Sequence, residues 1–580
     1  MFVSVSGFAG AYDRICRDAL QPDKKVLIVA AMDVDAACAC GILTRLFEQD
    51  GVQYQVYPVR NYIDVNDISQ LLAGGDGQLF CAAILLNVGA SYDAAELMQA
   101  HETQPNEHMT IYMFEAHRPI NLYNVFGDVQ IFDDGETSTA IPERDAVYLT
   151  DDEDEDDEDD RSDASDNEDT ASEGGTPEKR TKRQRYEDRR LRRLQTQSYY
   201  EYSYHTTPIS VLLWHLVMEK RRESNDSLWR AMVALVEAFV EDRISAELYS
   251  RMYSDLKRDM ERLNASDESE GIVRTVHLRE IKQDFRFPLY RHWNIYDAMC
   301  NSRYVAARVD VWKTKGEAAL CNMLAQVGVS KQTCKQNFIA WTDGNARKRV
   351  MESLIQALTD MGIDHCTIPS FEYQFEYQRA LSASDLAYAV GAQFLFPRAE
   401  GDWQQAFYTS LDILTMRKRA AFEDGCNKAM ELERVLLRQV QTCLNNGGTS
   451  MAKRYRLYSI LDTSDHKYFH SYGMLHRLAR FLVDHRRFSI GARRSAEHHI
   501  VASRADDKIL LVGIWAKKRR QEGDAVPNKF GSLFERMTDL HASLYEGTTA
   551  TQFERPMLEL KPDRMQEFCN VLVRVLTESA

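Results

Sequence analysis

The first 135 residues alternate between short apolar runs and segments with helical spacing of apolar residues. Between the apolar runs, the segments Ala36–Phe47, Asn66–Leu72 and Ala94–Ala100 have the helical pattern. A strand–helix–strand order repeated in this way predicts a parallel, doubly wound sheet. The predicted strands are Lys25–Ala31, Val52–Val59, Phe80–Leu86, Thr110–Phe114 and Val129–Phe132.

The pattern changes twice after Thr207. Helices dominate first, with a long amphipathic stretch over Gln404–Asn445 that ends at Gly447-Gly448, a typical helix C-cap. Strands and helices then alternate again. The helices predicted after Thr207 are Ile209–Lys220, Ser227–Phe239, several within Arg303–Gly362, Phe530–Leu544 and Arg564–Leu576, and the late strands are Tyr455–Leu461, Phe488–Ile490, Ile509–Trp515 and Met557–Leu560.

These patterns predict an α/β protein made of three parts. The N-terminal part is a doubly wound parallel sheet, the middle part is a helical insertion, and the C-terminal part is an α/β domain with a mixed sheet. The predicted limits are 1–240 for the N-terminal part, 303–400 for the helical insertion and 401–580 for the C-terminal part. A disordered insertion interrupts the first part at about 140–197, and a mainly helical connector, 241–302, joins the first part to the second.

The net charge of −17 is concentrated in one tract. Residues 151–173 carry fifteen acids and one arginine, a net charge of −14 that leaves −3 for the rest of the chain. Such a tract has little to bury and predicts disorder. The nearly neutral remainder gives no field that would draw the whole molecule onto DNA.

A basic cluster of nuclear-import type follows the acidic tract, and we expect it to direct the chain to the nucleus. Its alternative interpretation is the solvated start of a helix. Ser165 and Thr176 lie in short patterns that resemble kinase sites. The cluster consists of Lys179, Arg180, Lys182, Arg183 and Arg185.

Composition excludes several classes of protein. The eleven cysteines include no C-x-x-C pair, so we expect reduced thiols and neither a zinc finger nor a disulfide framework. The first twenty residues lack a secretory signal pattern, and the chain contains no apolar run of membrane-spanning length. No G-x-x-x-x-G-K-[ST] motif occurs, so the chain lacks the usual phosphate loop of an ATP-driven motor.

Polar side chains follow three of the predicted strands. Asp33 and Asp35 come after the first strand, Asn87 after the third, and Glu115 and His117 after the fourth. The carboxyl ends of parallel strands share one edge of a sheet, so these groups should meet in one crevice. Carboxylates and imidazoles there could hold two divalent cations. The motif alone favours the alternative that Asp35 is the N-cap of Ala36–Phe47.

Three turns, DVDA, ILLN-x-G and EAHRP, resemble motifs of the DHH phosphoesterases, which include the manganese-dependent RecJ exonucleases. Over essentially its whole length the chain more closely resembles the cell division control protein 45 family, a RecJ-like subunit of the eukaryotic replicative helicase. The segments that carry this resemblance are MFVS, AAMDVDAACACGIL, VQYQVYPV, AHRPINLYNV, YHTTPISVLLWHL, RHWNIYDAMCNSRYVAAR and NKFGSLFE.

The resemblance implies a DHH-like N-terminal domain and a DHHA1-like C-terminal domain. It also implies an incomplete metal site. Asn87 stands where the nucleases have an aspartate, and Ala116 stands where they have a histidine. The remaining vestigial positions would be Asp33, Asp35, Glu115, His117 and Glu237. We therefore expect no catalytic residue, metal or cofactor. An active manganese phosphoesterase, with Glu115 and His117 as ligands, is the alternative.

As a member of this family the chain would be a scaffold. It would be one copy within a hetero-oligomer, bound to the MCM ring and the GINS complex, with weak contact to single-stranded DNA at most. Tyr304, Trp312 and Phe338 are candidates for partner docking, or for the insertion's own core. The nucleic-acid candidates are Arg118 and the cluster Lys517, Lys518, Arg519 and Arg520, and the cluster is equally consistent with solvated surface.

Overall fold

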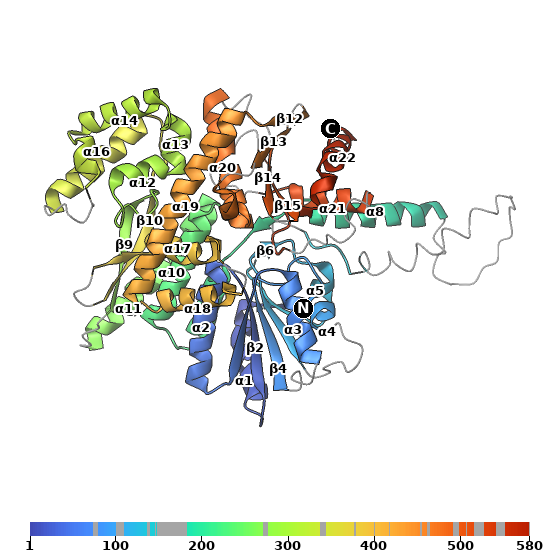
Figure 1. Ribbon diagram of the computed structural model, residues 1–580. Helices are drawn as coiled ribbons and strands as arrows, with labels where there is room; N and C mark the ends of the chain where they lie inside the picture. The colour runs from blue at the N-terminus through green and yellow to red at the C-terminus, as the bar shows by residue number, and fades with distance from the viewer. Residues whose placement is uncertain are drawn as a thin grey trace, which may run out of the picture.

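The computed structural model covers most of the chain and shows how its parts are layered (Figure 1). The parallel sheet is at the bottom of the view, the helical layers lie to one side, and the C-terminal sheet is above it. The residues that the structure describes are 1–73, 79–99, 109–135, 140–144, 147, 182–270, 276–336, 344–375, 379–398, 401–416, 418–452, 455–460, 464–490, 498–505, 507–515, 527–540 and 552–578.

Six strands form the N-terminal sheet in the order β1-β7-β5-β4-β2-β3, and all neighbouring strands are parallel. The predicted parallel, doubly wound arrangement is confirmed. The strands are β1 (Phe2–Val3), β2 (Lys25–Ala31), β3 (Tyr54–Val59), β4 (Phe80–Leu86), β5 (Thr110–Phe114) and β7 (Gln130–Phe132), and the helices between them are α1 (Phe8–Ala19), α2 (Val34–Asp50), α3 (Tyr62–Ala73), α4 (Ala94–Gln99) and α5 (Leu122–Phe126).

Helix α2 is enclosed between this sheet and helices that come later in the chain. Its small residues Ala36, Ala37 and Ala39 are fully buried, which allows close packing around the start of the helix. The helix ends at Gly51, which adopts the left-handed conformation with φ of 68°. Strand β2 has buried residues on both faces, as parallel strands covered by helices do.

The helices after residue 208 cover α2 and extend the core away from the sheet. Helix α10 contacts α2 on one side and α17 on the other, and α17 contacts α19. One cluster of buried apolar side chains therefore runs from the first sheet to α20. The helices are α9 (Ile209–Glu219), α10 (Asn225–Val240), α11 (Ala246–Glu270), α17 (Ala383–Leu395), α18 (Trp403–Leu414), α19 (Arg419–Asn446) and α20 (Tyr472–Ile490).

A small antiparallel sheet of order β11-β10-β9 lies within the region predicted to be helical. Strands β9 and β10 were not predicted. In β9 the charged residues Arg279, Glu280, Lys282 and Asp284 hide the alternation of a half-buried strand. The strands are β9 (Val276–Phe285), β10 (Thr367–Phe375) and β11 (Leu381–Ser382). The helices of the block between them are α12 (Ile295–Asn301), α13 (Arg303–Val309), α14 (Thr314–Val327), α15 (Lys331–Cys334) and α16 (Gly344–Asp360), which share a separate core.

The C-terminal sheet is mixed, as predicted, with order β12-β13-β14-β15-β16 and one parallel pair, β13 with β14. Strand β14 was not predicted. The predicted strand Phe488–Ile490 was wrong, because α20 continues through these residues. The elements are β12 (Thr449–Ala452), β13 (Tyr455–Ile460), β14 (His498–Ala505), β15 (Lys508–Ile514), β16 (Met557–Leu560), α21 (Phe530–Leu540) and α22 (Met565–Glu578).

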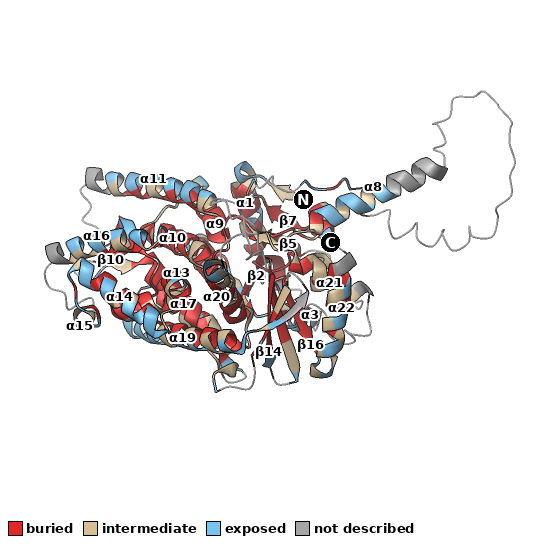
Figure 2. Ribbon diagram, turned by 90° about the horizontal axis from the view of Figure 1, so that it is seen from above, coloured by how far each residue is buried: buried red, intermediate tan, exposed pale blue. Residues whose placement is uncertain are grey.

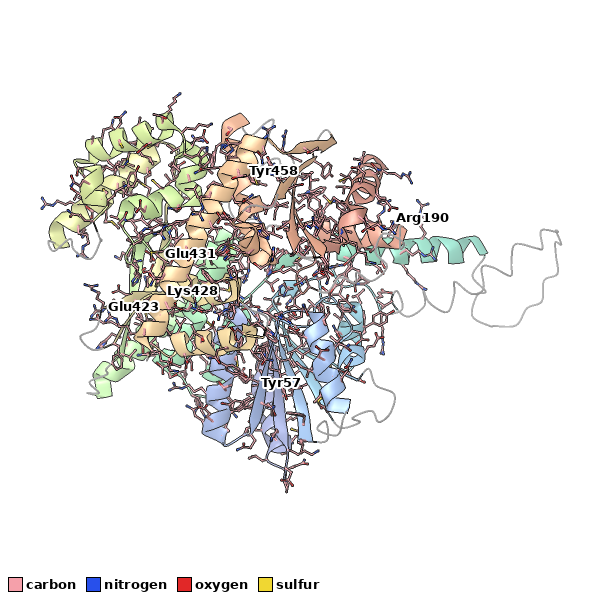
Figure 3. All side chains as sticks on the ribbon, in the orientation of Figure 1. Tyr57, Arg190, Glu423, Lys428, Glu431 and Tyr458 are labelled. Carbon is pink, nitrogen blue, oxygen red and sulfur yellow. The ribbon has the colours of Figure 1, made fainter. Side chains whose placement is uncertain are left out.

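The basic half of the predicted disordered insertion is partly a helix, α8 (Lys182–Tyr200), which projects from the body. Its last turn is anchored because Tyr199 packs on Leu122 and Val147. Farther from that anchor, α8 carries exposed residues such as Arg190 (Figure 3). The acidic tract, Ser165, Thr176, Lys179 and Arg180 lie outside the described residues.

Burial follows the layers (Figure 2). Strand β2 and helix α17 are mostly buried, whereas α8 and α16 expose their outer faces. All eleven cysteines are free thiols. Within the described residues, a helix that is both long enough and apolar enough to cross a membrane was not found.

Candidate functional site

Three adjacent strands, β2, β4 and β5, deliver the predicted site residues to one edge of the sheet. Asp33 follows β2 and is the N-cap of α2, where its Oδ1 accepts a hydrogen bond of 2.7 Å from the Ala36 amide. Asn87 follows β4, and Glu115 follows β5. Asn87 contacts both Asp33 and Asp35 at this edge, whereas Glu115 contacts His117, and the N-cap of α2 is Asp33 and not Asp35.

Asp35 points away from α2 and binds the N-terminus of α9. Its carboxylate accepts hydrogen bonds from the Ile209 amide at 2.8 Å, the Ser210 amide at 2.9 Å and the Ser210 hydroxyl at 2.7 Å. An aspartate is well placed there, because the first amides of a helix lack partners within the helix. Asp35 therefore joins two helices that are far apart in the sequence.

Asn87 lies between the two aspartates with a fixed orientation. Its Oδ1 accepts a hydrogen bond from the Ala116 amide at 3.1 Å, which places Nδ2 on the other side. Nδ2 is 3.3 Å from Asp33 Oδ2 and 3.4 Å from Asp35 Oδ2. The residue has φ of 56°, a left-handed conformation that asparagine adopts more readily than most residues.

Glu237 on α10 reaches the same crevice and is paired with a cation of the chain. Its Oε2 is 3.1 Å from a guanidinium nitrogen of Arg243. Burial raises the pKa of Glu237 to about 8 and that of Asp33 to about 6, and it also raises the pKa of Asp35. In Asp33 the Arg243 charge opposes that rise.

These side chains do not fit the pair of manganese ions that the resemblance to nucleases would imply. Both oxygens of Asp35 already accept two hydrogen bonds each, counting the one from Asn87. The Asn87 amide directs hydrogen atoms, and Arg243 a positive charge, toward the place where a cation would need oxygen ligands. The crevice is therefore filled by donors of its own chain.

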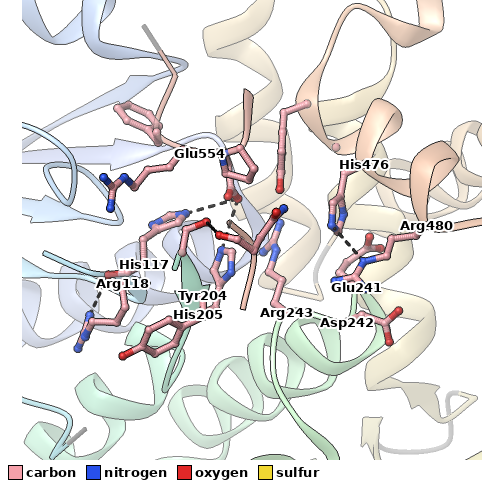
Figure 4. Close-up of a pocket in the computed structure, with 17 residues that line it drawn as sticks. His117, Arg118, Tyr204, His205, Glu241, Asp242, Arg243, His476, Arg480 and Glu554 are labelled. Atoms are coloured by element: carbon pink, nitrogen blue, oxygen red, sulfur yellow. Dashed lines mark hydrogen bonds and ion pairs between the residues drawn. The ribbon is translucent and has the colours of Figure 1, made fainter. Parts of the chain in front are cut away.

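A second group of polar residues lies beside the crevice, at the junction with the C-terminal sheet (Figure 4). His117, in β6 (His117–Arg118), faces His205, in β8 (Tyr204–His205), and Glu554 lies against both. These three residues line a pocket with about 60 Å³ of interior space. His205 and Glu554 were not predicted as site residues, because neither belongs to a motif shared with His117.

Arg118 is buried and paired within the chain, and its role as a nucleic-acid contact stays a prediction. Its guanidinium donates hydrogen bonds to the carbonyl oxygens of Glu115 and His117, and it lies 2.8 Å from Asp134. An arginine with these partners holds the turn after β5 in place.

The other candidates are either half-buried or not described. The Arg286 guanidinium lies 3.9 Å from the ring centre of Tyr304, and Trp312 packs against Phe481 and His485. Both aromatic side chains are half-buried. Their role in docking stays a prediction. The candidates outside the described residues, or without described side chains, are Phe338, Lys182, Arg183, Arg185, Lys517, Lys518, Arg519 and Arg520.

Comparisons with known proteins agree over nearly the full length. The profile of the family described as CDC45 matches residues 26–193 and 175–575. The cell division control protein 45 homolog of Homo sapiens is 27% identical, with 96% of this chain and 97% of that protein covered. The homolog of Schizosaccharomyces pombe is 31% identical over 68% of this chain and 66% of that protein. The crystal structure of CDC45 from Entamoeba histolytica has a TM-score of 0.70 at 17% identity, with both chains covered completely.

Proposed function

Because this chain belongs to the cell division control protein 45 family, we propose that it acts in DNA replication as a non-catalytic subunit of the replicative helicase. In this role it joins the MCM ring to the GINS complex in the nucleus, as one copy in a hetero-oligomer. Its contact with single-stranded DNA is weak. Family membership supports the replication role, and the geometry of the crevice supports the absence of catalysis.

The observation that carries the non-catalytic role is the state of Asp35. A two-metal hydrolase needs carboxylate oxygens that are free to bind cations and that remain ionised. Both oxygens of Asp35 are held by Ile209, Ser210 and Asn87. A cation could reach them only by breaking the contact between α2 and α9.

The raised pKa values of the neighbouring acids also disfavour the binding of cations. Glu237, with a pKa of about 8, holds its proton at neutral pH. Its nearest cation is Arg243, at 3.1 Å. The crevice therefore offers a divalent cation less negative charge than its acidic residues alone suggest.

A scaffold role is also consistent with the continuous core. The buried cluster that links the first sheet to α20 holds the two sheets in one body. Such a body can keep two partner surfaces at a fixed distance. The net charge of −3 outside the acidic tract supports weak rather than strong contact with DNA.

The test of this proposal is a nuclease assay on single-stranded DNA with manganese, using the parent protein and Asp33→Ala. We expect no cutting that depends on Asp33. Cutting by the parent protein that Asp33→Ala abolishes would establish the alternative, an active manganese phosphoesterase.

The scaffold role is tested separately, by mixing the full chain with purified MCM and GINS and measuring co-elution. Both the parent and Asp33→Ala should form the complex, because the substitution lies in a crevice that we propose plays no catalytic part. Failure of the parent protein to co-elute with either partner would contradict the scaffold role.

A further inference from the structure

Two histidines face each other where the N-terminal and C-terminal sheets meet. Strands β6 and β8 are antiparallel, and His117 pairs directly with His205. Directly paired residues in such strands point to the same face. Their imidazole ring centres are therefore close, at 4.7 Å. Glu554, from the segment just before β16, lies against both rings (Figure 4).

From this arrangement we propose that His117, His205 and Glu554 bind one zinc ion. Among the described residues, they form the one group of at least three histidine, cysteine or acidic side chains whose potential ligand atoms converge, all within 4.8 Å of one another. Two imidazoles and a carboxylate are typical zinc ligands. The site differs from the strand-end crevice, because Asp33 and Asp35 are not part of it.

The orientation of His117 is set by a carboxylate behind it. Glu115 Oε1 lies 2.6 Å from His117 Nδ1 and also accepts a hydrogen bond from the His117 amide at 3.0 Å. In the neutral ring, a hydrogen bond donated by Nδ1 to Glu115 leaves the lone pair of Nε2 directed toward Glu554. Histidine ligands of zinc are commonly held by a carboxylate in this way. Glu115 is thus a positioning residue of the site and not a ligand.

The distances fit ligands around an ion better than direct hydrogen bonds. Glu554 Oε1 is 3.5 Å from His117 Nε2 and 3.4 Å from His205 Nε2. Hydrogen bonds between nitrogen and oxygen are usually shorter, at about 2.7–3.2 Å. Two atoms that each bind a tetrahedral zinc ion at ~2.0–2.2 Å are about 3.4 Å apart. His205 Nε2 has no hydrogen bond in the structure, although it is buried.

The surroundings favour a single ion with one open position. The three side chains are 15%, 18% and 16% exposed, so the group is shielded but can be reached from the pocket. The pocket has about 60 Å³ of space, enough for a water molecule as fourth ligand. Arg243 lines the same pocket, and its positive charge opposes a cation there, but its guanidinium is directed to Glu237 at 3.1 Å and is not one of the three converging side chains.

Zinc at this place would connect parts of the chain that are far apart in the sequence. Two ligands belong to the strands beside the N-terminal sheet, and Glu554 directly precedes the last strand of the C-terminal sheet. Because the complete set of ligands exists only in the folded chain, bound zinc stabilises the fold. The inference goes beyond the proposed scaffold role and does not depend on it.

The experiment measures zinc in the full-length protein by mass spectrometry, after loading with zinc and dialysis against metal-free buffer. We expect about one zinc ion per chain, and a cobalt-loaded sample should show the intense visible absorption of a tetrahedral site. His205→Gln and Glu554→Gln should each lower the zinc affinity by more than tenfold. Glu115→Gln should lower it by ~10–100-fold, since it removes a partner that orients a ligand.

Two matched variants make the result decisive. His277→Gln removes an exposed histidine of β9, and Asp33→Ala alters the crevice; both should keep the zinc. Absence of zinc in the parent protein would overturn the inference. It would also be overturned if His205→Gln and Glu554→Gln bound zinc as tightly as the parent protein does. Loss of zinc only in Asp33→Ala would indicate that the ion binds in the crevice, and would also overturn the inference. Circular dichroism checks folding, and if one ligand variant does not fold, the other decides.

Discussion

Two polar regions lie side by side in this protein: the crevice at the ends of β2 and β4, and the junction between the two sheets. Their polar groups have different hydrogen-bond partners. In the crevice, hydrogen-bond donors from α9 and Asn87 surround Asp35. At the junction, two imidazoles face one carboxylate at distances longer than usual hydrogen bonds. In the crevice, Asp35 therefore holds α2 and α9 together. At the junction, the Nε2 atoms of His117 and His205 have no short hydrogen bond to Glu554.

This difference shows that a carboxylate at a strand end has no fixed role. Its role depends on what the rest of the chain brings to it. Asp35 meets the N-terminus of a helix, whose amides satisfy it, whereas Glu554 meets two neutral or cationic rings. Four substitutions test the contrast, in order of the expected effect.

Arg118→Met should have the largest effect, because it removes a buried cation that holds the turn carrying His117. Arg118 lies 2.8 Å from Asp134, and the substitution leaves that buried carboxylate without this partner. We expect a loss of about 4 kcal/mol in the free energy of unfolding, measured with denaturant. Zinc affinity should fall as well, because the turn carries the ligand His117. Unchanged stability would show that Arg118 does not hold the turn.

Asp35→Ala should cost about 3 kcal/mol, because it leaves the amides of Ile209 and Ser210 buried without an acceptor. The comparison is Asp33→Ala, which removes one helix cap and should cost only about 1 kcal/mol. Urea unfolding of both variants measures the difference. Equal losses would mean that Asp35 does not join α2 to α9 more strongly than an ordinary cap.

Asn87→Asp replaces a donor between two aspartates with a third carboxylate. We expect a loss of about 2 kcal/mol at neutral pH, because a third carboxylate would be buried beside Asp33 and Asp35 with the Ala116 amide as its donor. Manganese should raise the melting temperature of this variant and leave that of the parent almost unchanged. A similar rise for the parent would indicate that the crevice already binds cations.

Glu237→Gln should have the smallest effect, seen mainly in the pH dependence of stability. The folded-state pKa of Glu237 is about 8, above the value of roughly 4.3 for an unfolded chain. Between these values the folded state holds the proton more tightly, so the contribution of Glu237 to stability falls as pH rises. The melting temperature of Glu237→Gln relative to the parent should therefore increase from pH 5 to pH 9. A constant difference would contradict the raised pKa.

Sequence patterns located the first sheet well, because fully apolar strands such as β2 and β4 leave little choice of structure. They also placed Asp33, Asn87 and Glu115 at one edge, since parallel strands share their carboxyl ends. They could not show that Asp35 caps a helix that begins 174 residues later, because only the tertiary fold brings Ile209 to it. The same reason explains why Glu554 was missed. Strand β9 was missed because its charged residues resemble an exposed helix.

The continuous core from the first sheet to α20 has a consequence for how the protein is made. While the chain leaves the ribosome, α10 emerges well before α17 and α19, the helices that cover its outer side. A long nascent chain therefore carries an uncovered apolar face during synthesis. We expect that truncated versions ending before α17 aggregate in cells unless a chaperone is supplied, whereas the full chain accumulates in soluble form.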